Sequence, residues 1–159
     1  GVYVEPTDTA IIAPTSPTDT PLRFAAATAC SFNSVAMKVE QVTIDAGNEV
    51  IMLEDATQSS GFLHGIITNR RPTITANPEA VLIATQNRHN IWTTSTAYAV
   101  QITLDGPSTS TLGITAPKAQ IINIQEGDRN RIVTDEVEFL CTKNGATQNE
   151  ELYFTFTPT

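Results

Sequence analysis

The sequence predicts an all-β fold, a β-sandwich or barrel of about eight short strands with one short α-helix. The first observation is composition: Thr, Ile and Val contribute 50 of the 159 residues, whereas Leu contributes only 8. Side chains branched at Cβ lose rotamer freedom in a helix but fit well on a pleated sheet. The second observation is a series of alternating apolar segments separated by turns rich in Gly, Pro and Asn. This pattern is typical of a sandwich or barrel and excludes a helix-dominated fold.

The chain divides into an N-terminal segment and one β domain. Residues 1–21 contain four prolines and no apolar periodicity, so we expect an extended Pro/Thr-rich arm or linker. Residues 22–159 are long enough to form a single sandwich with its own core. The chain opens at Gly1 without Met and enters a strand-like apolar stretch at once. We interpret this as the C-terminal fragment of a longer protein.

The first half of the domain predicts several strands. Apolar residues alternate over 35–39 and again over 42–44, with a change of parity at Gln41. One extra residue in a β-bulge produces such a change, so we expect a bulge there. Further strands are expected at residues 50–53, 62–68 and 72–76.

Residues 77–91 carry the helix signal. Asn77 is a good capping residue, Pro78 suits the first helical position, and Glu79 favours the positive end of the helix dipole. We expect a helix of roughly two to three turns in this region.

The second half returns to strand patterns. Residues 94–104 form the clearest one, with an apolar or β-branched residue at every second position. Asp105 and Gly106 predict the turn that ends it. The remaining strands are expected at residues 118–125, 133–141 and 151–157.

Charge and cysteine content limit the function. The net charge of −8 opposes tight binding to nucleic acid or to an anionic membrane, because both require a basic surface. No stretch approaches the roughly 20 apolar residues of a membrane-spanning helix. Cys30 and Cys141 lack the spacing of a metal site, and we expect two buried free thiols on strands.

Residues for catalysis and for metal or cofactor binding are few. His64 and His89 have no convincing partner in the sequence, and none of the eight serines lies in a Gly-x-Ser-x-Gly motif. A calcium loop that began at Asp128 would need Gly and Glu where Val133 and Phe139 stand. Arg70–Arg71 are expected at the rim of a turn. The residues therefore offer little material for catalysis, and we expect no cofactor and no metal.

Four stretches together resemble a known family. They are GVYVEPTDTA at 1–10, ITNRRPTITANPEA at 67–80, APKAQIINIQEGDRN at 116–130 and NEELYFTFTPT at 149–159. In this order and spacing they resemble the C-terminal half of tail tube (major tail) proteins of long-tailed phages and prophages. The resemblance covers nearly the whole chain. Arg131 stands where the family pattern has a glycine after the Gly-Asp-Arg turn.

The resemblance implies a structural virion protein that is not an enzyme. Such subunits associate with one another and with other tail proteins, and their stacked rings form a conduit through which DNA passes without tight binding. It implies a location in the phage tail, after assembly in the bacterial host cytoplasm, and no contact with a membrane. Free strand edges would supply pairing between subunits, and acidic side chains would line the lumen and repel DNA phosphates. The candidates for the lumen are Glu126, Asp128, Asp135, Glu136, Glu138, Glu150 and Glu151.

Two alternatives from other classes stay open. An immunoglobulin-like decoration or adhesin module that binds host surface glycans would need exposed aromatic rings, for which Trp92, Tyr98 and Tyr3 are the available material. A small hydrolase on a β scaffold would need a cleft in which His64 or His89 lies beside a carboxylate.

Overall fold

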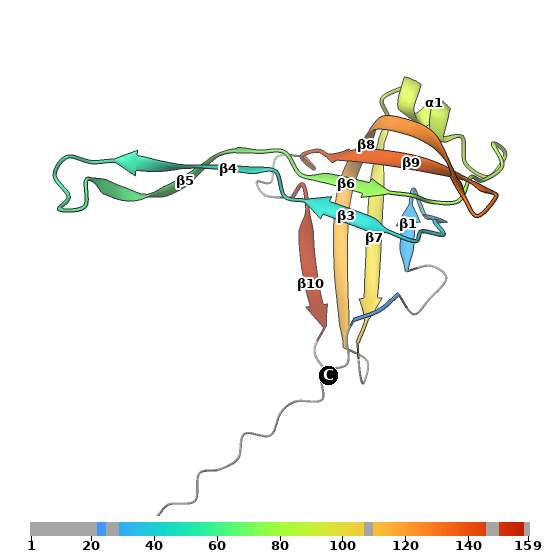
Figure 1. Ribbon diagram of the computed structural model, residues 1–159, viewed down its shortest axis with the longest axis horizontal. Helices are drawn as coiled ribbons and strands as arrows, with labels where there is room; N and C mark the ends of the chain where they lie inside the picture. Colours follow the sequence, from blue (N-terminus) through green and yellow to red (C-terminus); the bar gives the residue numbers. More distant parts are fainter. Residues whose placement is uncertain (1–21, 25–28, 107–109, 146–149, 158–159) are drawn as a thin grey trace, which may run out of the picture.

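The structure is a computed structural model that describes residues 22–24, 29–106, 110–145 and 150–157 (Figure 1). The arm or linker expected at residues 1–21 lies outside the described residues. The predicted fold class is confirmed, because the described chain is mostly antiparallel strands with one short helix. In chain order the elements are β1 (Cys30–Phe32), β2 (Val35–Ala36), β3 (Val42–Asp45), β4 (Asn48–Glu54), β5 (Phe62–Arg70), β6 (Thr73–Ala76), α1 (Arg88–Thr93), β7 (Ala97–Asp105), β8 (Thr111–Arg129), β9 (Ile132–Cys141) and β10 (Tyr153–Thr157).

Eight strands form one sheet in the order β2-β1-β7-β8-β9-β6-β3, with β10 paired to β8 beside this path. The long strand β8 organises the sheet. Its first part pairs with β7 on one side and β10 on the other, and its later part pairs with β9. Figure 1 shows β7 and β10 running across the direction of β3, β6 and β9. One continuous sheet therefore supplies both layers of an orthogonal sandwich, with the corner made by β8.

The core lies between these two layers. Phe32 of β1 meets Phe139 of β9 with ring centroids 4.9 Å apart, and Tyr98 of β7 packs edge-on against Phe32 at 6.0 Å. The alternation predicted for two strands is confirmed. In β7, Val100 and Ile102 are buried, whereas Gln101 and Thr103 are exposed. The same holds for the second half of β9, where Val137, Phe139 and Cys141 are buried.

The helix predicted at residues 77–91 is wrong in position, because α1 spans only Arg88–Thr93. The cap is Asn87, whose side-chain oxygen accepts a hydrogen bond from the Asn90 N–H at 2.8 Å. Asn77 uses the same chemistry across the fold, where its side chain accepts from the N–H groups of Glu40 and Gln41. Glu79 forms a β-bridge with Thr134. Residues 77–79 are therefore held extended against β9.

The bulge expected at Gln41 is also wrong. Val35 lies in β2, which pairs with β1, whereas Val42 lies in β3, which pairs with β6. The parity changes because the chain leaves one layer and enters the other, and the backbone at Glu40 and Gln41 is held by Asn77.

The extents of two strands differ most from expectation. The strand expected at 94–104 begins at Ala97, because Thr94 caps the C-terminus of α1. The strand expected at 118–125 is the middle of the 19-residue β8, which runs on through Arg129. Asn130 and Arg131 then form the turn into β9, both with positive φ. Among the described residues no helix is long and apolar enough to cross a membrane.

Candidate assembly surface

Strands β4 and β5 form a two-stranded sheet of their own, separate from the sandwich. Figure 1 shows this hairpin extending away from the body, and we call it the projecting hairpin (residues 48–70). Its strands are antiparallel, with two irregularities in register, and every residue of β4 is exposed. Seven large apolar side chains of the hairpin are between 38% and 60% exposed. They are Val50, Ile51, Met52, Leu53, Phe62, Leu63 and Ile67.

The tip of the projecting hairpin is acidic and polar. The Thr57 hydroxyl and the Thr57 N–H both donate to the Asp55 carboxylate, at 2.6 and 2.8 Å. These hydrogen bonds hold the pKa of Asp55 below its ordinary value. The neighbouring Glu54 is exposed as well. The tip therefore carries negative charge at neutral pH, in contrast to the apolar shaft.

The root of the projecting hairpin is fixed by a close backbone contact. The Arg71 N–H donates to the Gly47 carbonyl at 3.1 Å, and the Gly47 N–H donates to the Asp45 side chain at 2.9 Å. Gly47 has a φ of +54°, and a Cβ at this position would overlap the Arg71 carbonyl. Glycine is therefore required by both the turn and the approach of the two chains.

The body carries an apolar surface at β10, the strand that pairs with β8 beside the main path of the sheet. We call this surface the open end (Phe154 and Phe156). Phe154 lies opposite Ile114, which lies opposite Ile102, so the three share the core face of the sheet. Their exposure rises along this row, from 2% at Ile102 through 7% at Ile114 to 55% at Phe154. In the next row Phe156 is 72% exposed. The core face thus continues beyond the part that the opposite layer covers.

A second apolar surface of the body is the loop patch (Leu82, Ile83 and Val133). Leu82 and Ile83 follow β6 and are 78% and 74% exposed, and Val133 at the start of β9 is also exposed. The Ala80 N–H donates to the Val133 carbonyl at 2.9 Å, which holds the loop against β9. The β8–β9 turn beside this patch lies at the end of the body away from the projecting hairpin (Figure 1).

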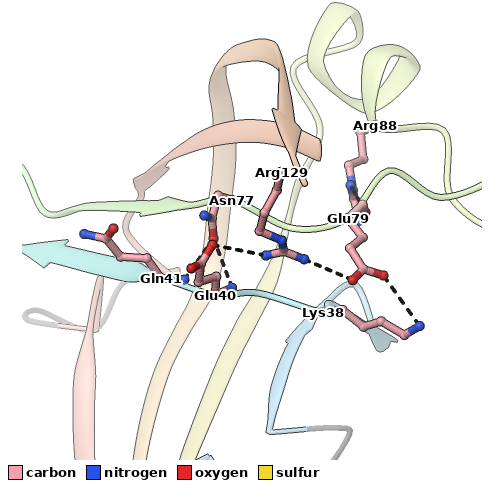
Figure 2. Close-up of polar contacts among 7 residues, drawn as sticks. All are labelled: Lys38, Glu40, Gln41, Asn77, Glu79, Arg88 and Arg129. Atoms are coloured by element: carbon pink, nitrogen blue, oxygen red, sulfur yellow. Dashed lines mark hydrogen bonds and ion pairs between the residues drawn. The ribbon is translucent and has the colours of Figure 1, made fainter. Parts of the chain in front are cut away.

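An ion-pair network surrounds Glu79, in the segment that leads from β6 to the loop patch (Figure 2). Arg129 reaches Glu79 at 3.0 Å and Glu40 at 3.9 Å, and Lys38 reaches the other oxygen of Glu79 at 3.5 Å. Figure 2 shows Arg88 coming from α1 toward the same segment, where it donates to the Glu79 carbonyl at 3.2 Å. Exposed pairs such as Lys38–Glu79 contribute at most about 1 kcal/mol each. The network serves mainly to position the loop.

The seven acidic residues predicted for a lumen lie in three places. Glu136 and Glu138 of β9 lie on the outer face of the sheet, opposite Gln125 and Asn123 of β8. Asp135 lies on the other face opposite Glu126, and its carboxylate is bound by Arg88 at 2.7 Å. Asp128, near the end of β8, is on the same face as Glu126, and Glu150 and Glu151 lie before β10. The structure therefore does not bring the seven together.

The outer face around Glu136 and Glu138 is mostly polar. Glu138 lies opposite Thr75 of β6, which lies opposite Thr43 of β3. Thr43, Thr75 and Glu136 are exposed and line a shallow hollow together with Gln41 and Asn77. We call this surface the polar sheet face. Its described members are Thr43, Thr75, Asn123, Gln125, Glu136 and Glu138.

The aromatic residues considered for glycan binding are placed separately. Tyr98 is half-buried and packs on Phe32 in the core. Trp92 of α1 is 38% exposed, with the His89 ring 6.5 Å away. Tyr3 lies outside the described residues. The exposed aromatic rings at the open end come from β10 instead.

The histidines and cysteines are also separated. His64 lies on β5 of the projecting hairpin and His89 on α1, both exposed. Across the described ranges no three His, Cys, Asp or Glu residues are grouped to hold a metal ion. Cys30 and Cys141 are buried free thiols, as predicted, and burial raises the pKa of each to about 11. Arg70 and Arg71 lie at the root of the projecting hairpin, where Arg70 lines a hollow together with Glu151.

Sequence reasoning missed the exposed apolar shaft of the projecting hairpin. The signal was present in the uninterrupted run Val50–Leu53, which differs from the alternation of a strand with one covered face. Comparison with known proteins adds no relative, since no family model and no curated protein matches this chain.

Proposed function

We propose that this chain is a structural protein that acts by assembling with copies of itself, as the C-terminal half of a phage tail tube subunit. The projecting hairpin carries the proposal. A hairpin of two strands is marginally stable in water by itself, and this one exposes seven large apolar side chains outside the sandwich. Contiguous apolar surface of this kind marks an interaction site.

Energetics favour an assembly with several contacts per copy. Covering seven half-exposed apolar side chains contributes about 7 kcal/mol, at about 1 kcal/mol for each. Bringing two proteins together costs about 4–15 kcal/mol in lost freedom and ordering. One hairpin contact therefore does little more than offset the cost of one association. A closed ring or a stack, in which each copy both gives and receives such contacts, reaches stable association.

The polar sheet face supports the second part of the proposal, a conduit for DNA. Glu136 and Glu138 project from it among threonine and amide side chains, and the whole chain carries a net charge of −8. A surface of this kind repels phosphates and offers them no cation to bind. In this proposal the polar sheet face lines the lumen of the tube, and the protein is part of the virion tail, assembled in the bacterial host cytoplasm.

Electron microscopy of the purified protein at high concentration tests the proposal. Hollow tubes or rings of uniform width are expected, and the number of copies per ring gives the stoichiometry. A variant with Ile51→Asp and Met52→Asp should stay monomeric, whereas Ala56→Asp with Ser59→Asp, which adds the same charge at the exposed tip, should assemble. Particles that stay single even with other tail components added would contradict the proposed function.

A further inference from the structure

The projecting hairpin is apolar on both of its faces. Val50 lies opposite Ile67, and Met52 lies opposite Gly65, whose missing side chain leaves space beside the Val50 and Met52 side chains. These residues form the first face. Ile51 lies opposite Ile66, so this pair belongs to the second face together with Leu53. Each face exposes at least two large apolar side chains.

Two apolar faces require two neighbouring surfaces that shield them from water. A strand that is covered on one side alternates between apolar and polar residues, whereas a strand that is buried on both sides reads as a continuous apolar run. Val50–Leu53 is such a run. A hairpin lying flat on one neighbouring surface would leave its other face in water.

The body of the same chain offers two surfaces that lack a cover among the described residues. The open end continues the core face through Phe154 and Phe156, and among the described strands β10 pairs with β8 alone. The loop patch exposes Leu82 and Ile83. It lies at the other end of the body from the projecting hairpin (Figure 1), so a hairpin can reach it only from another copy.

We propose that each projecting hairpin lies between two further copies of this chain, with one face against the open end of one copy and the other face against the loop patch of the next. This proposal rests on the self-assembly proposed above. In a symmetric assembly every copy gives and receives the same contacts. Two apolar faces on each hairpin therefore match two apolar surfaces on each body, and the acidic tip stays in solvent.

Substitution of one face at a time tests the proposal. Val50→Asp with Met52→Asp changes the first face, and Ile51→Asp with Leu53→Asp changes the second. Both variants should raise the concentration needed for assembly at least tenfold in sedimentation. The control Ala56→Asp with Ser59→Asp, which carries the same added charge at the tip, should assemble like the wild type. At a concentration below that of assembly, circular dichroism should give the same melting temperature for all, because the hairpin lies outside the core.

The outcomes separate this inference from the proposed function. Loss of assembly in only one of the two face variants means that the hairpin lies on a single surface, which overturns the inference and leaves self-assembly intact. Normal assembly of both variants overturns the inference and removes the hairpin from the interface. A wild-type protein that stays monomeric at all concentrations overturns the proposed function itself.

A mixing experiment tests the two receiving surfaces. Copies with Phe156→Asp and Ile83→Asp keep the hairpin, and copies with Val50→Asp and Ile51→Asp keep the receiving surfaces. Each should be monomeric alone, and the mixture should give small complexes by native mass spectrometry. Absence of mixed complexes would overturn the assignment. A large fall in the melting temperature of the monomeric Phe156→Asp single variant would also overturn it, since the chain itself would then cover the open end.

Discussion

The Arg88 guanidinium on α1 and the Asp135 carboxylate on β9 form an ion pair at 2.7 Å, with side chains only 2% and 16% exposed. Arg88 also donates to the Gln86 side chain at 3.1 Å, and Gln86 donates to the Phe32 carbonyl at 2.9 Å. The pair therefore joins the helix, β9 and β1 at one edge of the core. Removal of one partner leaves the other as a buried charge without compensation, which lowers the stability of the fold.

Asp135→Ala should lower the free energy of unfolding by about 3–5 kcal/mol, since Arg88 then stays buried without its partner. Urea unfolding measures the change. Lys38→Ala is the matched control, because Lys38 is 79% exposed in its pair with Glu79 and should cost at most about 1 kcal/mol. The double variant Arg88→Met with Asp135→Leu should recover most of the loss. Equal stability of Asp135→Ala and the wild type would contradict this role for the pair.

Arg131→Gly should stabilise the protein by about 1 kcal/mol. Arg131 has a φ of +69° in the β8–β9 turn, and a non-glycine residue in the left-handed region costs about 1–2 kcal/mol. The larger entropy of glycine in the unfolded chain offsets part of this gain. Thermal unfolding measures the shift. Gln125→Gly, in the extended part of β8, is the control and should destabilise by about 1 kcal/mol; a fall in stability for Arg131→Gly would refute the argument.

The sequence correctly predicted the strands in which apolar residues alternate because every second residue is buried. Val137, Phe139 and Cys141 alternate in the sequence and are buried in β9, and the two cysteines are free and buried. The helix was misplaced because Asn77 has good capping chemistry but uses it on Glu40 and Gln41, 37 and 36 residues away. Local patterns contain no information about such a distant partner. The same limit applies to Asp135, one of the lumen candidates, because its ion-pair partner Arg88 is 47 residues away in the sequence.

Gly47→Ala should destabilise the body by about 2–4 kcal/mol, which combines the left-handed backbone with an overlap on the Arg71 carbonyl. The effect reaches the sandwich because Gly47 joins β3 to β4 and Arg71 joins β5 to β6. Gly61→Ala is the matched control. Gly61 also has a positive φ, +74°, but a Cβ there meets nothing within 4 Å.

Gly61→Ala should leave urea unfolding of the body unchanged, and electron microscopy should find normal assemblies. Gly47→Ala should assemble poorly, because the root sets the direction of the projecting hairpin. Identical behaviour of the two variants would show that the contact with Arg71 has no influence on stability or assembly.

The two buried thiols predict a loss of stability at high pH. Burial raises the pKa of Cys30 and Cys141 from 9.0 to about 11. The unfolded chain therefore loses these protons first, and the free energy of unfolding should fall as the pH rises from about 9 to 11. Comparison with the Cys30→Ala, Cys141→Ala variant isolates the contribution, because its slope over this range should be smaller. The native thiols should also resist a thiol reagent at pH 8 and react after unfolding; rapid reaction in the native state would contradict their burial.

Reversal of charge on the polar sheet face should make assembled tubes retain DNA. Glu136→Lys with Glu138→Lys places two cations on the face that we propose lines the lumen, and cations bind phosphates by releasing counterions. Co-sedimentation of tubes with duplex DNA should rise from background to clear retention, and the retention should fall as salt is added. Glu126→Lys with Asp128→Lys adds the same charge outside this face, since Glu126 lies opposite Asp135 rather than Glu136. Tubes of this control should retain much less DNA, and equal retention by the two variants would place the lumen elsewhere.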